Sequence, residues 1–181
     1  MKLWLVRHAM PVIASGVCYG ASDVPADVVG TEAIAKTLAL ALPDGVVVVA
    51  SPLQRCACIA ASLTVLRPDL RWLTDTRLQE MNFGAWEGQA WDAIDRRDME
   101  AWTADFADWR CGGAESVRDV MQRVGSAWDD AKTSRVERAW ITHAGVIRAA
   151  TLIAKGTREM VNSAQWPREP IAFGQIQTLN D

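Results

Sequence analysis

Residues 4–11, WLVRHAMP, and residues 139–148, AWITHAGVIR, both place a histidine directly after an apolar run. These are the only two histidines of the 181-residue chain. Apolar runs without polar alternation are typical of strands that are covered on both faces, as in parallel sheets. Because the carboxyl ends of such strands lie at one edge, where these sheets bind ligands, we expect His8 and His143 to meet there.

The rest of the chain alternates strands with helices. A turn is expected at 44–45 and further strands at 46–50, 71–74 and 171–179. Helices are expected at 31–43, 115–132 and 144–156, with another after residue 51 and two short ones within 91–109. This alternation predicts an α/β fold, a three-layer sandwich with a mainly parallel central sheet and helices on both faces. The length suits a single domain over residues 1–181, whose core needs no disulfide or metal.

Local signals predict where two of the helices begin. Ser51 is the expected N-cap of the helix after the second strand, with Pro52 at its first position and Gln54 completing a capping box. Ser116 is the expected N-cap of the later amphipathic helix, with Asp119 three residues on.

Composition and charge exclude several classes of protein. The formal net charge of −3 and the lack of a basic stripe give no reason to expect nucleic acid as a partner. No stretch is apolar for long enough to be a signal peptide or a membrane span, so we expect a cytoplasmic protein with no membrane partner. Cys18, Cys56, Cys58 and Cys111 form no CxxC pair, and buried, reduced thiols are expected. The sequence specifies no oligomeric state.

Cationic residues follow three of the expected strands. Arg7 and His8 follow the first, Arg55 in SPLQR opens the helix after the second, and His143 follows a later one, with Ala144 where the next helix begins. Side chains of a first helical turn lean toward the helix N-terminus, where free backbone N–H groups can receive an anion. Phosphate is the expected ligand, because guanidinium groups bind it through two parallel hydrogen bonds.

A structural role is the alternative for any single histidine, since a lone histidine beside an apolar strand is more often a satisfied core group. That interpretation has to explain both histidines and an arginine at matching strand ends. Burial of an unpaired charge costs several kcal/mol, whereas each charge-assisted hydrogen bond returns about 1.5 to 3 kcal/mol. Such a cluster persists only with an anionic partner, which disfavours the structural role.

At these residues the sequence resembles the histidine phosphatase superfamily, which includes cofactor-dependent phosphoglycerate mutase. The matching pieces are LVRHA (5–9), SPLQRC (51–56), RLQEMNFGAWEG (77–88) and THAGVIR (142–148), in the family's order. The resemblance implies a phosphoglycerate mutase-like fold. The EMNFGAWEG form and the short length are most similar to the α-ribazole phosphatase branch, which acts in assembly of the cobalamin nucleotide loop.

The sequence departs from the family pattern after the first histidine. The family usually has glycine there, followed shortly by threonine or serine and by asparagine, whereas this chain has Ala9, Met10 and Pro11 and no hydroxyl until Ser15. Some phosphate contacts of the family are therefore absent or supplied by other residues. The methyl group of Ala9 is tolerated if the φ angle of this residue stays negative.

The resemblance implies a phosphomonoesterase that works through a phosphohistidine. His8 would be the nucleophile, Glu80 the acid that protonates the leaving alkoxide, and His143 the third catalytic residue. The groups that would hold the phosphate oxygens are Arg7, Arg55, His143 and Ala144. No metal or other cofactor is expected, and the implied partner is a small-molecule phosphomonoester.

Other residues of the motifs have structural explanations. Glu87 is the rival acid, but we expect it to pair with a backbone group or an arginine. Glu115 lies outside the expected core site, although it could border it. Core packing is the expected role of most tryptophans in this region, with stacking on a flat base such as dimethylbenzimidazole as the alternative. These tryptophans are Trp86, Trp91, Trp102 and Trp109.

Three alternatives remain open. One is a broad-specificity phosphatase of sugar or other small phosphomonoesters, or a phosphoglycerate mutase, although mutases usually have longer chains. A second is a non-catalytic phospho-ligand binder, against which the complete set of motif residues argues. The third is a metalloprotein that uses both histidines, which is disfavoured because no suitable carboxylate or cysteine lies at ligand spacing.

Overall fold

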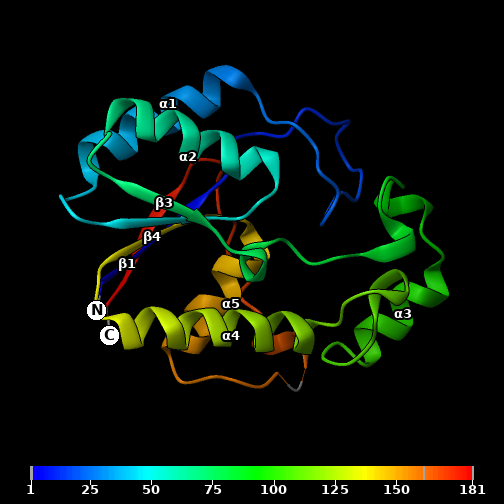
Figure 1. Cartoon of the computed structure of the whole chain (residues 1–181). Helices are drawn as coiled ribbons and strands as arrows, with labels where there is room; N and C mark the ends of the chain where they lie inside the picture. The colour runs from blue at the N-terminus through cyan, green and yellow to red at the C-terminus, as the bar shows by residue number, and fades with distance from the viewer. Residues whose placement is uncertain (1, 161, 181) are drawn as a thin grey trace.

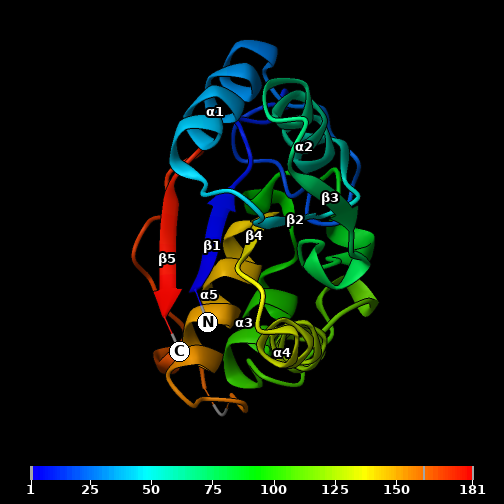
Figure 2. The ribbon, with the colours of Figure 1, turned by 60° about the vertical axis from the view of Figure 1, so that its left-hand side comes forward.

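A five-stranded sheet lies at the centre of the computed structural model, which describes residues 2–160 and 162–180. The strand order is β3-β2-β4-β1-β5, and all strands are parallel except β5, which runs antiparallel to β1 (Figure 2). The strands are β1 (Lys2–Arg7), β2 (Val47–Ala50), β3 (Arg71–Thr74), β4 (Arg138–Thr142) and β5 (Ile176–Asn180).

Two pairs of helices cover the two faces of this sheet (Figure 1). Helices α1 (Val28–Ala41) and α2 (Gln54–Leu66) pack on one face, and α4 (Val117–Ser134) and α5 (Ala144–Ala154) pack on the other. Helix α3 (Arg96–Ala104) lies with irregular segments beyond the carboxyl ends of the parallel strands. The predicted three-layer α/β sandwich is confirmed.

The two helical layers explain the apolar runs of the central strands β1, β2 and β4, because alternate residues of such a strand enter different cores. Ala139 and Ile141 of β4 pack with α1 and α2, whereas Trp140 packs with α4 and α5. Burial of a large apolar side chain contributes about 1.5 to 3 kcal/mol relative to exposure. A strand of this composition is therefore stabilised on both of its faces.

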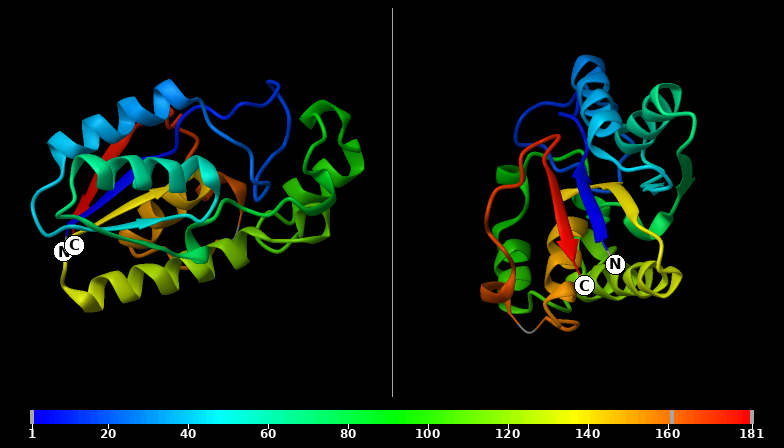
Figure 3. Two further views of the ribbon diagram at one scale, coloured as in Figure 1. Left: turned by 45° about the horizontal axis from the view of Figure 1, so that its top comes forward. Right: turned by 90° about the vertical axis from the view of Figure 1, so that its left-hand side faces the viewer.

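The register between β1 and β4 determines which residues meet beyond the strands. Arg7 pairs with Thr142 at the last position of this ladder, so His8 and His143 follow it side by side. The amide of His8 continues the pairing by donating to the carbonyl of Thr142 at 3.0 Å. At the amino end of β1, the start of this strand pairs with the end of β5, which brings the two ends of the chain close together (Figure 3).

Several predicted boundaries differ from the structure, and two of the differences have an evident physical cause. Helix α1 begins at Val28 rather than at residue 31, because the side chain of Asp27 caps it by accepting a backbone hydrogen bond from its first turn. The last strand is shorter than 171–179, since it begins at Ile176 after a turn in which Gly174 has a φ of +73°.

The predicted capping box at Ser51 is wrong. Helix α2 begins at Gln54, its N-cap is Leu53 and no side chain caps it, so Pro52 lies before the helix. The backbone and side-chain nitrogens of Gln54 instead donate to Asp23 in the long loop, both at 2.7 Å. This connection ties the loop to the start of α2, and it leaves the Ser51 hydroxyl for a partner at the sheet edge.

Other predicted elements are confirmed. The segment 91–109 contains a 3₁₀ turn, Trp91–Ala93, followed by α3. Ser116 and Asp119 form the predicted capping box of α4. Helix α5 ends shortly before Gly156, which has a φ of +88°.

The cysteines are only partly as expected. All four are free thiols, and Cys18, Cys56 and Cys111 are buried, but Cys58 is exposed. Residues two apart on a helix point to different sides, so Cys56 and Cys58 of α2 cannot both face the core. None of the helices in the described ranges is long and apolar enough to cross a membrane.

Candidate active site

Two imidazole rings lie next to each other at the carboxyl edge of the sheet. The ring centroids of His8 and His143 are 5.1 Å apart, close to the spacing of neighbouring strands. Both side chains are almost completely buried, with 2% of His8 and none of His143 exposed. The parallel pairing of β1 and β4 is thus what brings the two histidines together.

The chemistry of His8 depends on which ring nitrogen carries the proton. Nδ1 lies 2.6 Å from the carbonyl oxygen of Ala9, which can only accept, so the proton is on Nδ1 and Nε2 holds a lone pair. Burial, together with the charges of Arg55 and Arg7, lowers the pKa of His8 to about 3. The ring is neutral near pH 7 and can act as a nucleophile. Ala9 keeps a negative φ, as its methyl group requires.

His143 is held between two side chains of the SPLQR segment. The Nε of Arg55 donates to Nδ1 of His143 at 3.3 Å, so the ring proton is on Nε2, which lies 2.9 Å from the Ser51 hydroxyl. The thiol of Cys56 is 3.5 Å from the same Nε2. Burial, Arg55 and His8 hold the pKa of His143 well below its ordinary value. Both ring nitrogens are therefore bonded within the protein.

Arg55 is completely buried and donates to protein groups from three of its nitrogens. Besides the bond to His143, Nη1 donates to the carbonyl of Ser22 at 2.7 Å and Nη2 to that of Gly20 at 2.6 Å. A guanidinium has five N–H donors, so two remain. Within residues 2–160 and 162–180, no carboxylate forms an ion pair with Arg55. Its charge is available to an anion.

Arg7 lies against the ring of Phe173, with its guanidinium carbon 3.9 Å from the ring centroid. One terminal nitrogen donates to the carbonyl of Ile171, whereas the buried Nε has no hydrogen-bond partner in the described part of the chain. The centroid of the Phe173 ring is 5.6 Å from that of His8. Because His8 is nearly buried, a substrate reaches its ring only if groups around it move.

Glu80 lies in the loop after β3, where backbone amides orient its carboxylate. Oε1 accepts from the amide of Met81 at 3.0 Å, and Oε2 accepts from the amide of Gly145 at 3.1 Å. A Cβ atom at Gly145 would lie 2.3 Å from Oε1, so only glycine lets the carboxylate approach this closely. Ala144 is the first residue of α5, where a backbone N–H has no intrahelical partner.

A cavity of about 250 Å³ lies on one side of Glu80, between α5 and the segment that contains α3. Five of its lining residues are aromatic, and the rings of Trp102 and Phe106 are stacked at an interplanar angle of 18°. Trp86 packs edge-on beneath Trp102 in the core, and Trp109 lies outside the cavity. The lining includes Phe83, Trp91, Trp102, Phe106, Arg148 and Trp166.

Glu87 connects two loops of the site. Its carboxylate accepts from the amides of Ala21, Ser22 and Phe83 and from the Ser22 hydroxyl. The expectation that Glu87 pairs with backbone groups is confirmed. These bonds fix the loop whose carbonyls hold Arg55, so Glu87 stabilises the cationic cluster from a distance.

A family match agrees with this geometry. Residues 3–167 match the histidine phosphatase superfamily (branch 1). The chain belongs to this superfamily. As a histidine phosphatase it is a phosphoric monoester hydrolase. Among curated proteins, none matches the chain in sequence.

Solved structures of histidine phosphatase fold resemble the chain over nearly its whole length. A mycobacterial glucosyl-3-phosphoglycerate phosphatase is 23% identical, with a TM-score of 0.78, over 98% of this chain and 88% of that one. Its complex with inorganic phosphate gives a TM-score of 0.80 over the same shares. TTHB049 from Thermus thermophilus is 28% identical, with a TM-score of 0.71, over 98% of this chain and 92% of that one. The likeness to the mycobacterial phosphatase, at 23% identity, shows that the two proteins share a fold.

Sequence reasoning missed several groups at this histidine phosphatase site. Ser51 was expected to cap a helix, and nothing in the sequence connects it to His143 across 92 positions. Phe173 lies in a segment expected to be a strand. The contact between Gly145 and Glu80 could have been anticipated from the glycine in THAG, because a glycine at a helix start permits close approach. In the described ranges, no three His, Cys, Asp or Glu side chains gather as metal ligands do.

Neither histidine should titrate between pH 5 and 8. The pKa of His8 is lowered to about 3 and that of His143 is also depressed, so both rings stay neutral while the unfolded chain takes up protons below pH 6.5. Stability should therefore decrease as the pH falls from 6.5. Imidazole NMR signals measured from pH 8 to 5, assigned with His8→Asn, provide the test. A midpoint near 6.5 for either ring would contradict this prediction.

Gly145→Ala should displace Glu80 without unfolding the protein. The new methyl group would occupy the position of Oε1, and that oxygen ends a flexible side chain that can move. Alanine also favours a helix by about 1 kcal/mol over glycine. We expect an unchanged or higher Tm and a loss of about tenfold or more in kcat for an alkyl phosphate. Gly125→Ala in α4, whose methyl would meet Arg158 instead, is the matched control; equal activity of both variants would refute the prediction.

Proposed function

We propose that the chain hydrolyses phosphomonoesters through a phosphohistidine on His8. The observation that carries this proposal is the unprotonated Nε2 of a neutral imidazole beside two cationic side chains, Arg7 and Arg55. Nε2 attacks phosphorus in line, the bond from phosphorus to the ester oxygen breaks, and Glu80 transfers a proton to the departing oxygen. Water then attacks phosphorus and gives a proton to the Glu80 carboxylate while the bond from phosphorus to Nε2 breaks, which releases phosphate and restores both the ring and the acid.

The phosphate oxygens would be held by Arg7, Arg55, His143 and the amide of Ala144. Among the residues that the structure describes, two N–H donors of Arg55 and the Nε of Arg7 have no hydrogen-bond partner, which supports this assignment. Both nitrogens of His143 bond to protein groups, so contact with phosphate requires one of these bonds to yield. In this proposal, fixed cations do work that other phosphoryl-transfer enzymes share with magnesium, and no metal is required.

We propose α-ribazole 5′-phosphate, a substrate of cobalamin nucleotide-loop assembly, as the physiological substrate. The aromatic cavity beside Glu80 supports this choice, because a flat base can stack on its lining rings. Trp102 Nε1 and Arg148 Nε are buried without hydrogen-bond partners in the described residues, and both residues line this cavity. An apolar wall suits such a base better than the sugar of glucosyl-3-phosphoglycerate, on which the mycobacterial neighbour acts. The free thiols agree with a cytoplasmic location.

Loss of the nucleophile tests the reaction. His8→Ala should lower the hydrolysis of p-nitrophenyl phosphate by about 10³-fold or more, and EDTA should leave the wild-type rate unchanged. Rapid quenching with labelled substrate should trap an acid-labile phosphoenzyme in wild type but not in His8→Ala. Glu32→Gln on the exposed face of α1 is the control. Equal rates in wild type and His8→Ala would refute the mechanism, and a rate abolished by EDTA would favour the metalloprotein alternative.

The aromatic cavity should determine the choice of substrate. Trp102→Ala should lower kcat/KM for α-ribazole 5′-phosphate by about tenfold, since aromatic stacking is worth about 0.5 to 1.5 kcal/mol beyond area burial. Activity toward 3-phosphoglycerate and sugar phosphates should change little. Trp109→Ala, outside the cavity, is the matched control. Wild-type preference for sugar phosphates or 3-phosphoglycerate over the ribazole ester would refute this substrate assignment.

A further inference from the structure

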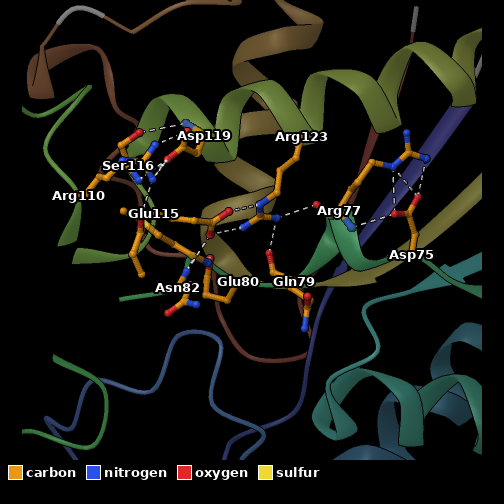
Figure 4. A network of polar contacts seen from close by, with 12 residues as sticks. Asp75, Arg77, Gln79, Glu80, Asn82, Arg110, Glu115, Ser116, Asp119 and Arg123 are labelled. Atoms are coloured by element: carbon orange, nitrogen blue, oxygen red, sulfur yellow. Dashed lines mark hydrogen bonds and ion pairs between the residues drawn. The ribbon is translucent and has the colours of Figure 1, made fainter. Parts of the chain in front are cut away.

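We infer that Arg123 and Glu115 are positioning residues that hold Glu80 in place for proton transfer. This inference rests on the proposed role of Glu80 as the acid. The pair, called the acid-loop clamp below, bonds to the loop 77–82 on both sides of Glu80, whereas the Glu80 carboxylate itself accepts from the amides of Met81 and Gly145 (Figure 4).

Arg123 holds the part of the loop that precedes Glu80. It projects from α4, and its Nη1 donates to the carbonyls of Arg77 and Gln79, both at 2.7 Å. Only 17% of the Arg123 side chain is exposed. A 3₁₀ turn ends at Leu78, so no regular structure supports the chain beyond it. Within the described residues, the carbonyls of Arg77 and Gln79 accept no hydrogen bond from a helix or strand backbone. Both accept from the same nitrogen of Arg123 instead.

Glu115 fixes the guanidinium and also holds the part of the loop that follows Glu80. Its carboxylate accepts from Nε and Nη2 of Arg123 at 2.8 and 3.1 Å, a bidentate arrangement. Oε2 also accepts from the amide of Asn82 at 2.9 Å, and the amide of Glu115 donates to the carbonyl of Asn82 at 3.1 Å. The two charged side chains neutralise each other and form hydrogen bonds with the backbone of residues 77, 79 and 82.

The carbonyl of Leu78, between those of Arg77 and Gln79, bonds directly to a residue that precedes His143. The Thr142 hydroxyl donates to the carbonyl of Leu78 at 2.7 Å, and Thr142 is the last residue of β4 before His143. Three consecutive carbonyls, those of residues 77 to 79, are thus held by side chains from α4 and β4. The position of Glu80 relative to the histidines follows from these bonds and from the amide of Gly145.

Loss of this clamp would let Glu80 shift relative to the histidines. Misplacement of a reacting group by about 1 Å can cost about 10²-fold in rate. A polar cavity of about 310 Å³ also lies beside Glu80, and Arg123 and Glu115 line it. A substrate bound there would make Arg123 a binding residue, so the test has to separate positioning from binding.

Two aryl-containing esters provide this separation. p-Nitrophenyl phosphate releases a stable phenolate that needs no proton, whereas benzyl phosphate releases an alkoxide that does. In single-turnover experiments, Arg123→Gln and Glu115→Gln should slow the release of benzyl alcohol from benzyl phosphate by about 10- to 10²-fold. The same variants should slow the release of p-nitrophenol from p-nitrophenyl phosphate by less than about twofold. The KM for either ester, measured at steady state, should be unchanged. Glu80→Gln should show the same pattern. Arg123→Lys should recover only part of the benzyl phosphate rate, because ammonium cannot bind bidentately.

Arg118→Gln is the matched control. Arg118 also lies on α4 and makes a two-pronged ion pair, with Asp108, but this pair does not touch the loop. We expect wild-type rates for both esters. Glu115→Gln and Arg123→Lys keep the inference testable if Arg123→Gln does not fold.

The possible failures are distinguishable. If Glu80→Gln affects benzyl phosphate selectively and the clamp variants slow both esters equally or raise only KM, the clamp is refuted and the acid assignment stands. If Glu80→Gln shows no selectivity between the esters, the acid assignment and the clamp are both refuted. Loss of phosphoenzyme formation in His8→Ala is independent of either outcome.

Discussion

The site depends on the in-register pairing of two parallel strands, β1 and β4. The ladder ends at Arg7 and Thr142, and the next residue on each strand is a histidine. A register slip of one residue would turn one of the rings to the opposite face of the sheet. The apolar side chains that alternate between the two cores oppose such a slip, because it would exchange Trp140 with its small neighbour Ala139. Core packing therefore sets the distance between the two imidazoles.

The same burial explains how the cluster can contain two arginines and two histidines. Desolvation keeps both imidazoles neutral, so only the guanidinium groups carry charge. Backbone carbonyls, rather than carboxylates, satisfy Arg55. A carbonyl accepts a hydrogen bond without cancelling the positive charge, which leaves the site electropositive within a chain of net charge −3. Glu87 holds these carbonyls in place through amides of the same loop.

The sequence predicts what local pattern controls and misses what distant contacts decide. Strands with two apolar faces, the alternation with helices and the capping box at Ser116 follow from neighbouring residues, and each is confirmed. Ser51 has the residue type of an N-cap, but its hydroxyl lies 2.9 Å from Nε2 of His143, which follows β4 far along the chain. Glu80 was selected only through the family resemblance. The support from Arg123 was missed because an amphipathic helix gives no sign that one of its arginines reaches two loop carbonyls.

Glu80 lies between two environments that divide the work of the proposed reaction. On one side, Arg123 and Glu115 fix the backbone of its loop through charged and backbone groups. On the other side, the aromatic cavity can take the alcohol part of an ester, so binding energy from that part brings the ester oxygen to the carboxyl group. Part of the cavity wall, namely Trp91, Trp102 and Phe106, comes from the segment around α3, outside the sheet that the histidines follow. Changes in this segment can therefore alter the preferred leaving group while the phosphoryl-transfer groups remain as they are.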